Sequence, residues 1–265
     1  MEVRRKGRIP VQSVARALTI LEALSSNRGD VGIAELSEKV GLHVSTVHRL
    51  LSTLKTKGYV RQSPENGRYT LGPKAFHLGH AYLEQHELRK VVRPFLERLS
   101  QASGETANLV ILDQGEAFYL DKVESERNLR IFSRIGHRAP LHCTAVGKVL
   151  LAHMPSEKVR EFIYDKPLEA LTRNTITSPP LLEQELRKVK EKGYAFDQEE
   201  CEDGACCIGV PLRDFTGEAV AAMSISGPSV RLTPEKLEEL VPLMKEVAEV
   251  ISSRLGYPPE GMPRL

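Results

Sequence analysis

The chain has 265 residues, of which 41% are hydrophobic and 27% are charged, an ordinary composition for a globular protein. This length is sufficient for two domains. No apolar run approaches the roughly 20 residues of a membrane-spanning helix, and the basic N-terminus lacks the apolar stretch of a signal peptide. The composition therefore argues against a membrane protein and predicts a cytoplasmic location, where cysteine thiols stay reduced.

Charge divides the chain into a basic and an acidic part. Residues 1–80 contain 13 Lys and Arg against 6 Asp and Glu, and the remainder contains 24 against 29. The first part has a net charge of +7 and the second of −5. A basic module joined to an acidic one indicates a polyanionic partner for the basic module, although charge alone would also fit a solvated basic face.

Three helices are expected in the basic part. The first shows helical spacing of apolar residues, with Ser13 as its expected N-cap. The second covers 33–40 and is followed by Gly41, which permits a sharp turn. The third ends at Lys57, before Gly58. Helix, tight turn and helix form a helix-turn-helix. The inward positions expected on the first and third helices are Val14, Ala17, Leu18, Leu21 and Leu24, and Val47, Leu50, Leu51 and Leu54.

The outer face of the third helix is suited to DNA. It has no Asp or Glu, which phosphates would repel, and it offers hydroxyl, imidazole and guanidinium groups for phosphates and base edges. We expect the DNA-contacting residues of this helix to be Ser45, Thr46, His48, Arg49 and Ser52.

A β-hairpin is predicted after Gly58. Residues 59–62 and 68–71 read as two strands joined through Asn66 and Gly67. Arg61 and Arg68, one on each strand, are expected to hold the DNA backbone or a minor groove. Three helices and a hairpin also occur in protein-docking modules, but the positive charge and the acid-free helix favour DNA.

The segments "SVARALTILEALS", "IAELSEKVGLHVSTVHRLLSTLKTKGYV" and "GRYTLG" resemble the DNA-binding domain of the IclR family of transcription regulators. The resemblance covers about residues 11–72 and implies a winged helix-turn-helix. Helical patterns follow up to residue 103, and Pro94 is expected to kink or restart the helix there. In proteins of this family the linker helix carries dimer contacts; the alternative is a rigid spacer.

The acidic part reads as a mixed α+β domain. Strands are expected at 106–112 and 117–123, with a third at 129–133, and helices at about 180–192 and 233–255. Thr144 is the expected N-cap of a helix rich in small residues. Residues 144–147 would form the floor of a carboxylate pocket, or alternatively a tight helix–sheet contact. Ser224 and Ser226 share one face of a late strand and need hydrogen-bond partners, either a ligand or the backbone.

The segments "PLHCTAVGKVLLA", "GYAFDQEE", "CIGVPLRD" and "AAMSISGP" resemble the effector-binding domain of the same family, which is similar to the GAF fold. The resemblance implies a site for a small acid. Members that bind very small keto acids tend to have Gly and Ala where this chain has Ala145 and Val146. These bulkier side chains would change the shape of the pocket, so the ligand of a relative cannot be assigned to this chain. The resemblance places the effector site at Ala145, Val146, Asp197, Cys207, Ser224 and Ser226.

Two other classes of function are less consistent with the sequence. An enzyme is disfavoured because no nucleophile elbow, phosphate loop or dinucleotide fingerprint is present. A metal- or thiol-responsive regulator would use Cys201, Cys206 and Cys207 together with Cys143, but their spacing matches no standard zinc pattern. Cysteines near strands are more often small buried hydrophobes.

The sequence thus predicts a DNA-binding regulator, a repressor, controlled by a small organic or sugar acid. It needs no cofactor or metal, and it binds a two-fold symmetric operator as a homodimer or a homotetramer. The expected domains are a basic tail (1–10), a winged helix-turn-helix (11–73), a helical linker (74–90), a GAF-like effector-binding domain (91–257) and a C-terminal tail (258–265).

Overall fold

The computed structural model describes residues 11–27, 29–85, 87–131, 133–165 and 167–257, and the expected tails at 1–10 and 258–265 lie outside these residues. The chain divides into two compact units between residues 85 and 86. The expected boundary at residue 90 falls inside a helix of the second unit, Glu87–Ser103. Among the described residues, none of the helices combines the length and the apolar character needed to cross a membrane.

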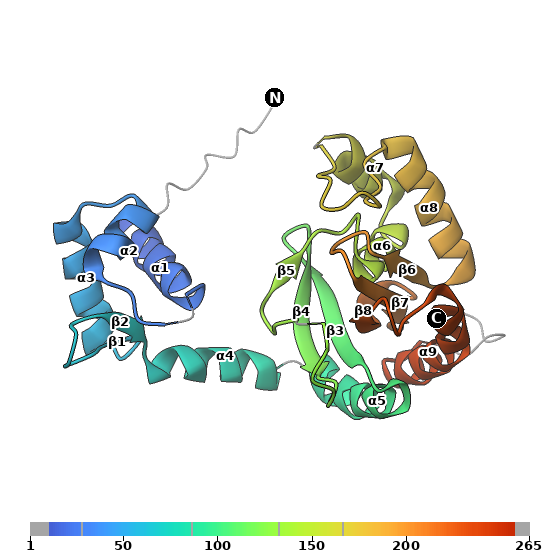
Figure 1. Cartoon of the computed structure of the whole chain (residues 1–265), viewed down its shortest axis with the longest axis horizontal. Helices are drawn as coiled ribbons and strands as arrows, with labels where there is room; N and C mark the ends of the chain where they lie inside the picture. Colours follow the sequence, from blue (N-terminus) through green and yellow to red (C-terminus); the bar gives the residue numbers. More distant parts are fainter. Residues whose placement is uncertain (1–10, 28, 86, 132, 166, 258–265) are drawn as a thin grey trace. The chain divides into compact units, whose positions relative to one another are not determined.

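The first unit is a winged helix-turn-helix, as predicted (Figure 1). Gly41 adopts a left-handed conformation, with φ 64°, and terminates α2 at the sharp turn before α3. Its elements are α1 (Gln12–Ser25), α2 (Ile33–Val40), α3 (Val44–Thr56), β1 (Val60–Gln62), β2 (Tyr69–Leu71) and α4 (Pro73–Gln85).

Helix α1 differs from the prediction at its start. Ser13 lies within the helix and Val11 occupies the N-cap position, without a side-chain cap. Val14 and Leu18 are 56% and 53% exposed, because α1 contacts the core of this unit through Ala17, Ile20, Leu21 and Leu24 instead. An apolar strip on α1 therefore faces out of the unit.

The hairpin forms with a longer connection than expected. Strands β1 and β2 pair antiparallel, and Ser63 and Arg68 close the loop through a backbone hydrogen bond of 2.8 Å. Arg68 precedes β2 rather than lying on it. Val31 adds an antiparallel bridge to Tyr69, so the wing is also fixed to the segment before α2.

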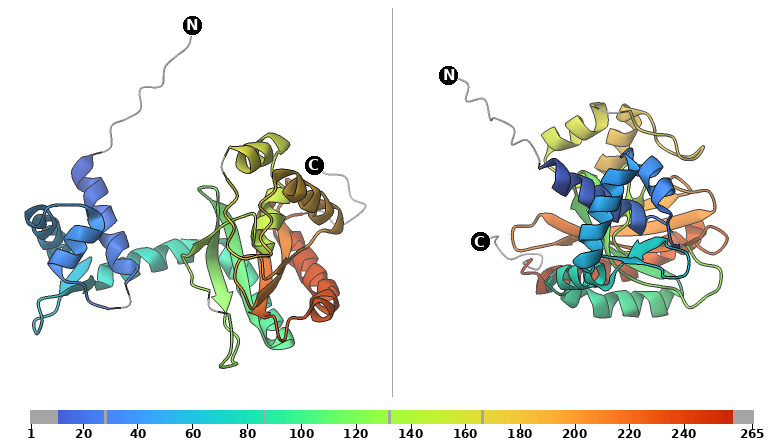
Figure 2. Two further views of the ribbon diagram at one scale, coloured as in Figure 1. Left: turned by 45° about the horizontal axis from the view of Figure 1, so that its top comes forward. Right: turned by 90° about the vertical axis from the view of Figure 1, so that its left-hand side faces the viewer.

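The second unit is an α+β domain built on a six-stranded antiparallel sheet in the order β5-β4-β3-β8-β7-β6. Helices α5 and α9 cover one face, and α6 covers the other, with α7 and α8 outside it (Figures 1 and 2). The strands are β3 (Thr106–Asp113), β4 (Glu116–Val123), β5 (Arg138–Ala139), β6 (Ala195–Gln198), β7 (Ala205–Arg213) and β8 (Ala219–Pro228). The helices are α5 (Glu87–Ser103), α6 (Ala145–Ala152), α7 (Ser156–Tyr164), α8 (Pro179–Lys192) and α9 (Pro234–Arg254).

Most of the elements predicted in this unit are confirmed, but the third strand is wrong. The described residues of 129–133 form no strand; the short strand β5 pairs with β4 instead. Pro94 lies inside α5, which continues past it to Ser103, so the helix does not restart there. Helix α7 was not predicted, because its surface is mostly polar and only Ile163 is buried.

Small residues at the start of α6 serve close packing. A Cβ on Gly147 would lie 2.4 Å from the Leu141 carbonyl oxygen, and a Cβ on Gly209 of β7 would lie 2.9 Å from the carbonyl carbon of Ala145. Helix α6 is therefore packed directly on β7 through main-chain atoms. This matches the tight helix–sheet contact that was the alternative interpretation of residues 144–147.

Candidate functional site

The outer face of α3 is accessible in the first unit. His43 caps the helix, with its Nδ1 atom 2.8 Å from the Ser45 hydroxyl. His48, Arg49 and Ser52 are exposed, and Thr46 is partly buried. The residues predicted on this helix therefore lie on one accessible surface. The Ser45 hydroxyl is already engaged with the cap, which holds it at the first turn.

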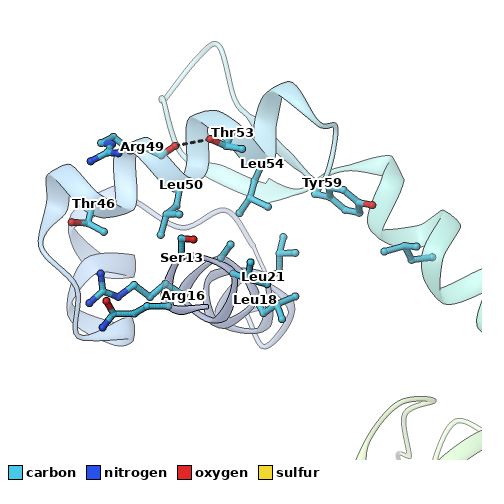
Figure 3. A pocket seen from close by; sticks show the side chains of 14 residues that line it. Ser13, Arg16, Leu18, Leu21, Thr46, Arg49, Leu50, Thr53, Leu54 and Tyr59 are labelled. Atoms are coloured by element: carbon cyan, nitrogen blue, oxygen red, sulfur yellow. Dashed lines mark hydrogen bonds between the residues drawn. The ribbon is translucent and has the colours of Figure 1, made fainter. Parts of the chain in front are cut away.

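A groove of 780 Å³ lies between α1 and α3 (Figure 3). Arg16 from α1 and Arg49 from α3 extend to the same end of this groove, near Thr46. Its other side is lined by the apolar side chains of Leu18 and Leu21. Arg16 was not among the predicted DNA-contacting residues, because the spacing argument for α1 considered only its apolar positions.

The two arginines of the wing have different surroundings. Arg61 on β1 is exposed. The Arg68 guanidinium donates to the Asp30 carbonyl at 2.9 Å and forms an ion pair with Glu35 at 2.8 Å. Arg68 therefore fixes the wing to the start of α2, and in this arrangement Arg61 is the wing arginine directed to solvent.

In the second unit the sheet brings the predicted effector residues together. Asp197 lies opposite Cys207, and Cys207 lies opposite Ser226, on neighbouring strands. Residues directly opposite one another point to the same face of a sheet. This is the face covered by α6, where Gly209 approaches Ala145. Five of the six predicted effector residues are buried, and the remaining one, Cys207, is partly exposed.

Asn108 on β3 is the central residue of this polar cluster, and sequence reasoning missed it. It is 0% exposed, and its Nδ2 atom donates to the hydroxyls of Ser224 and Ser226, both at 3.2 Å. Its Oδ1 atom accepts a hydrogen bond of 2.8 Å from Ser133, in the segment between β4 and β5. A polar residue inside the apolar strand "TANLVILD" was the signal that could have found it.

A buried ion pair joins α6 to the turn after β6. Lys148 of α6 is 1% exposed, and its Nζ atom lies 2.5 Å from Glu200 Oε1. Burial raises the pKa of Glu200 despite this ion pair. Burial also raises the pKa of Asp197 to about 7, although backbone N–H groups of Glu200 and Cys201 donate to its Oδ1 atom and oppose the rise. Asp197 is therefore partly protonated near neutral pH.

The cysteines do not form a metal site in the described part of the chain, where no three His, Cys, Asp or Glu side chains are grouped closely enough to hold an ion. The metal-responsive alternative therefore lacks a site among these residues. All four thiols are free.

Two family models match the chain. The IclR helix-turn-helix domain matches residues 13–64, and the bacterial transcriptional regulator IclR C-terminal domain matches residues 80–253. The chain belongs to the IclR family of transcription regulators. It is a DNA-binding regulator and not an enzyme, since its relatives regulate transcription.

Relatives share nearly the whole length of the chain. The HTH-type transcriptional regulator KdgR of Escherichia coli K12 is 41% identical over 247 residues, covering 93% of this chain and 94% of that protein. The transcriptional repressor IclR of the same organism is 36% identical over 248 residues, covering 93% and 90%.

Solved structures show the same two-domain fold. The IclR protein of Thermotoga maritima has a TM-score of 0.79 at 38% identity and covers 94% of this chain and 100% of its own. An IclR homologue from Microbacterium hydrocarbonoxydans, solved in complex with 4-hydroxybenzoate, has a TM-score of 0.80 at 26% identity and covers 92% and 98%. The predicted family and fold are confirmed.

Proposed function

We propose that this regulator is a repressor whose affinity for its operator is controlled by a small organic or sugar acid bound in the second unit. The observation that carries the proposal is the buried cluster of Asn108, Ser224 and Ser226 beside Asp197. Apolar side chains usually fill the contact between a helix and a sheet, whereas a few polar groups placed in such a contact are suited to recognise a polar ligand. The repressor assignment is supported by the relationship to the E. coli transcriptional repressor IclR.

The chemistry of the cluster fits an acid ligand. The Ser224 and Ser226 hydroxyls accept from the Asn108 amide, so their own protons can be donated to a carboxylate, and a protonated Asp197 can donate as well. The start of α6 at Ala145 and Val146 adds backbone N–H groups and the positive end of a helix dipole. The homologue crystallised with 4-hydroxybenzoate supports a carboxylate ligand for this fold.

For the DNA side, we propose that Arg49, His48 and Ser52 contact base edges in the major groove, while Ser45, Thr46 and Arg61 position the backbone. Arg68 acts by holding the wing in place. The protein works in the cytoplasm as a homodimer, which we place on the exposed apolar strip of α1 at Val11, Val14 and Leu18. A dimer presents two α3 helices and therefore requires an operator with two-fold symmetry.

Selection of bound sequences from random duplex DNA by the full chain tests the DNA assignment. We expect a two-fold symmetric motif. On that motif Arg49→Ala should bind more weakly by about 1–3 kcal/mol and lose discrimination at one base position per half-site. Arg160→Ala, which removes an exposed arginine on α7 of the second unit, is the matched control. Selection of a single asymmetric half-site, or equal binding by Arg49→Ala and the wild type, contradicts the assignment.

A thermal-shift screen of aromatic, organic and sugar acids, with 4-hydroxybenzoate among them, tests the effector assignment. An acid that binds the native state stabilises it by about 2.7 kcal/mol at a hundred-fold excess over its Kd. We expect the shift to disappear in Ser224→Ala/Ser226→Ala while binding to the selected DNA motif is retained. A shift of equal size in this variant would place the ligand elsewhere.

A further inference from the structure

Lys122 on β4 places a positive charge next to the polar cluster. It lies directly opposite Asn108 in the pairing of β3 with β4, so the two side chains point to the same face of the sheet. Both side chains also bind the same residue. The Lys122 ammonium donates to the Ser133 carbonyl oxygen, and the Ser133 hydroxyl donates to Asn108 Oδ1 at 2.8 Å. The Lys122 side chain is only 13% exposed, so its charge is held close to the amide that binds Ser224 and Ser226.

An acid effector needs such a charge. It would bring a carboxylate into a buried site, since Ser224 and Ser226 are almost inaccessible to solvent. Removing a carboxylate from water is unfavourable unless hydrogen bonds and a cation replace the water. Asn108 and the two serines are neutral, and Asp197 is either neutral or negative. The cluster therefore offers hydrogen bonds without a formal positive charge, and the adjacent Lys122 supplies that charge.

The carboxylate that Lys122 now contacts can be exchanged for a ligand. The Lys122 Nζ atom lies 2.5 Å from Glu124 Oε1, while Arg130 contacts the other carboxylate oxygen, Oε2, at 3.2 Å. Because the Glu124 side chain is 40% exposed and would keep Arg130, losing Lys122 costs it little. Arg93 of α5 donates to the Lys122 carbonyl oxygen at 2.9 Å, so the backbone is held while the side chain changes partners.

Lys148 of α6 is less suited to this role. Its Nζ atom lies 2.5 Å from Glu200 Oε1, and the other oxygen of Glu200 is buried with no hydrogen-bond partner among the described residues. If Lys148 moved to a ligand, the Glu200 carboxylate would lose this cation in a buried place, which is strongly unfavourable. The buried pair therefore stays together, and the exchangeable cation is Lys122.

We propose that Lys122 binds the carboxylate of the acid effector and releases Glu124 when it does so. The assignment rests on the proposed function, because it requires an acid at Asn108, Ser224 and Ser226. It makes the site selective for charge: a neutral amide of the same shape can still form hydrogen bonds with the serines, but it gains no ion pair with Lys122. Glu124 is an internal competitor, so removing its charge should tighten the binding of the acid.

Isothermal titration of the full-length protein with matched acids and amides tests the proposal. The probes are 4-hydroxybenzoate, D-gluconate and L-lactate, each compared with its neutral primary amide. We expect an acid of this set to bind, and its amide to bind at least about 10-fold more weakly. Lys122→Met should weaken the acid by about 10- to 100-fold without changing the Kd of the amide, and Lys122→Arg should recover most of the affinity. Lys236→Met, which breaks the ion pair with Glu239 on α9, is the matched control and should bind the acid as the wild type does.

Glu124→Gln gives a change of the opposite sign. It should tighten acid binding by about two- to five-fold, the amount that corresponds to an exposed ion pair. Glu126→Gln removes the same charge two positions further along the chain, at an exposed residue, and should leave the Kd unchanged. Should Lys122→Met fail to fold, Glu124→Gln decides, because an unchanged or weakened affinity in that variant contradicts the exchange of partners.

Failure of this assignment is distinguishable from failure of the proposed function. If no acid binds the wild type, the proposed function fails and the role of Lys122 fails with it. If an acid binds, and Ser224→Ala/Ser226→Ala abolishes its binding while Lys122→Met binds it as tightly as the wild type, the proposed function stands and the role of Lys122 is overturned. Equal Kd values for an acid and its amide in the wild type overturn it as well.

Discussion

At the residue scale, Asp197 connects burial with a pH dependence of stability. Its pKa is raised from 3.8 to about 7, so between these values the native state binds more protons than the unfolded state. The free energy of unfolding therefore falls as pH rises through this window. The whole shift corresponds to at most about 4 kcal/mol.

Asp197→Asn should remove this contribution and keep an oxygen for the two backbone hydrogen bonds. We expect the variant to lose less stability than the wild type between pH 4 and pH 8 when urea unfolding is measured at several pH values. Asp203→Asn, in the exposed turn nearby, is the control and should follow the wild type. Parallel stability profiles for Asp197→Asn and the wild type would show that Asp197 titrates normally.

Asn108 provides a second test at this scale. Removing its amide leaves the hydroxyls of Ser224, Ser226 and Ser133 without their shared partner in a buried site. Asn108→Ala should lower the free energy of unfolding by about 1–3 kcal/mol. Exposed Asn174→Ala, which removes one hydrogen bond to Gln198, should change it by less than about 0.5 kcal/mol. Equal effects in denaturant titrations would contradict the central role of Asn108.

The candidate site was predictable from sequence only in part. Ser224 and Ser226 were identified as sharing a face because alternation along a strand is local information. Asn108 lies 116 positions before Ser224, and only the pairing of β3 with β8 brings the two together. Spacing along the chain carries no record of that pairing, so the partner of the serines had to come from the structure.

At the element scale, the contact between α6 and β7 depends on Gly209. Gly209→Ala would place a Cβ atom 2.9 Å from main-chain atoms of α6 that cannot move aside independently. Strain of this kind costs about 1–3 kcal/mol. Gly79→Ala is the control, because its Cβ meets nothing within 4 Å on α4, and alanine should stabilise that helix slightly. Unchanged thermal stability of Gly209→Ala would mean that α6 can shift away from the sheet.

Element ends were predicted well where the capping chemistry is local. Thr144 and Thr233 cap α6 and α9, and Gly193 ends α8 in a left-handed conformation. The prediction that Val14 and Leu18 of α1 face inward was wrong. The helical spacing of these residues identifies an apolar strip, but it does not show which part of the protein covers that strip. Tertiary packing decides that point, and the core of the first unit contacts α1 through Ala17, Ile20 and Leu24 instead.

At the scale of the whole molecule, the exposed apolar strip on α1, formed by Val11, Val14 and Leu18, can be tested as the dimer interface. Leu18→Glu places a charge in an apolar surface that we assign to the dimer, and a buried unpaired charge opposes association strongly. Analytical ultracentrifugation should show dissociation to monomers at concentrations where the wild type stays dimeric. Leu181→Glu, at an exposed position of α8, is the matched substitution and should leave the dimer intact. A dimeric Leu18→Glu protein would place the interface elsewhere.

Regulation requires that the two units communicate, because the DNA-contacting residues lie in the first unit and the acid-binding cluster lies in the second. A ligand can shift the arrangement of the DNA-binding units only by its differential affinity for the two arrangements. Linkage then demands that operator DNA change the affinity for the acid by the same factor, with typical couplings of about 1–3 kcal/mol.

Isothermal titration of the acid found by thermal shift, with and without the selected operator, should give different Kd values. The isolated half-site should have little effect on the Kd, since the hypothesis concerns the spacing and orientation of two DNA-binding units rather than contacts within one. Equal Kd values with and without the full operator would end the allosteric interpretation, even if the acid binds at Ser224 and Ser226.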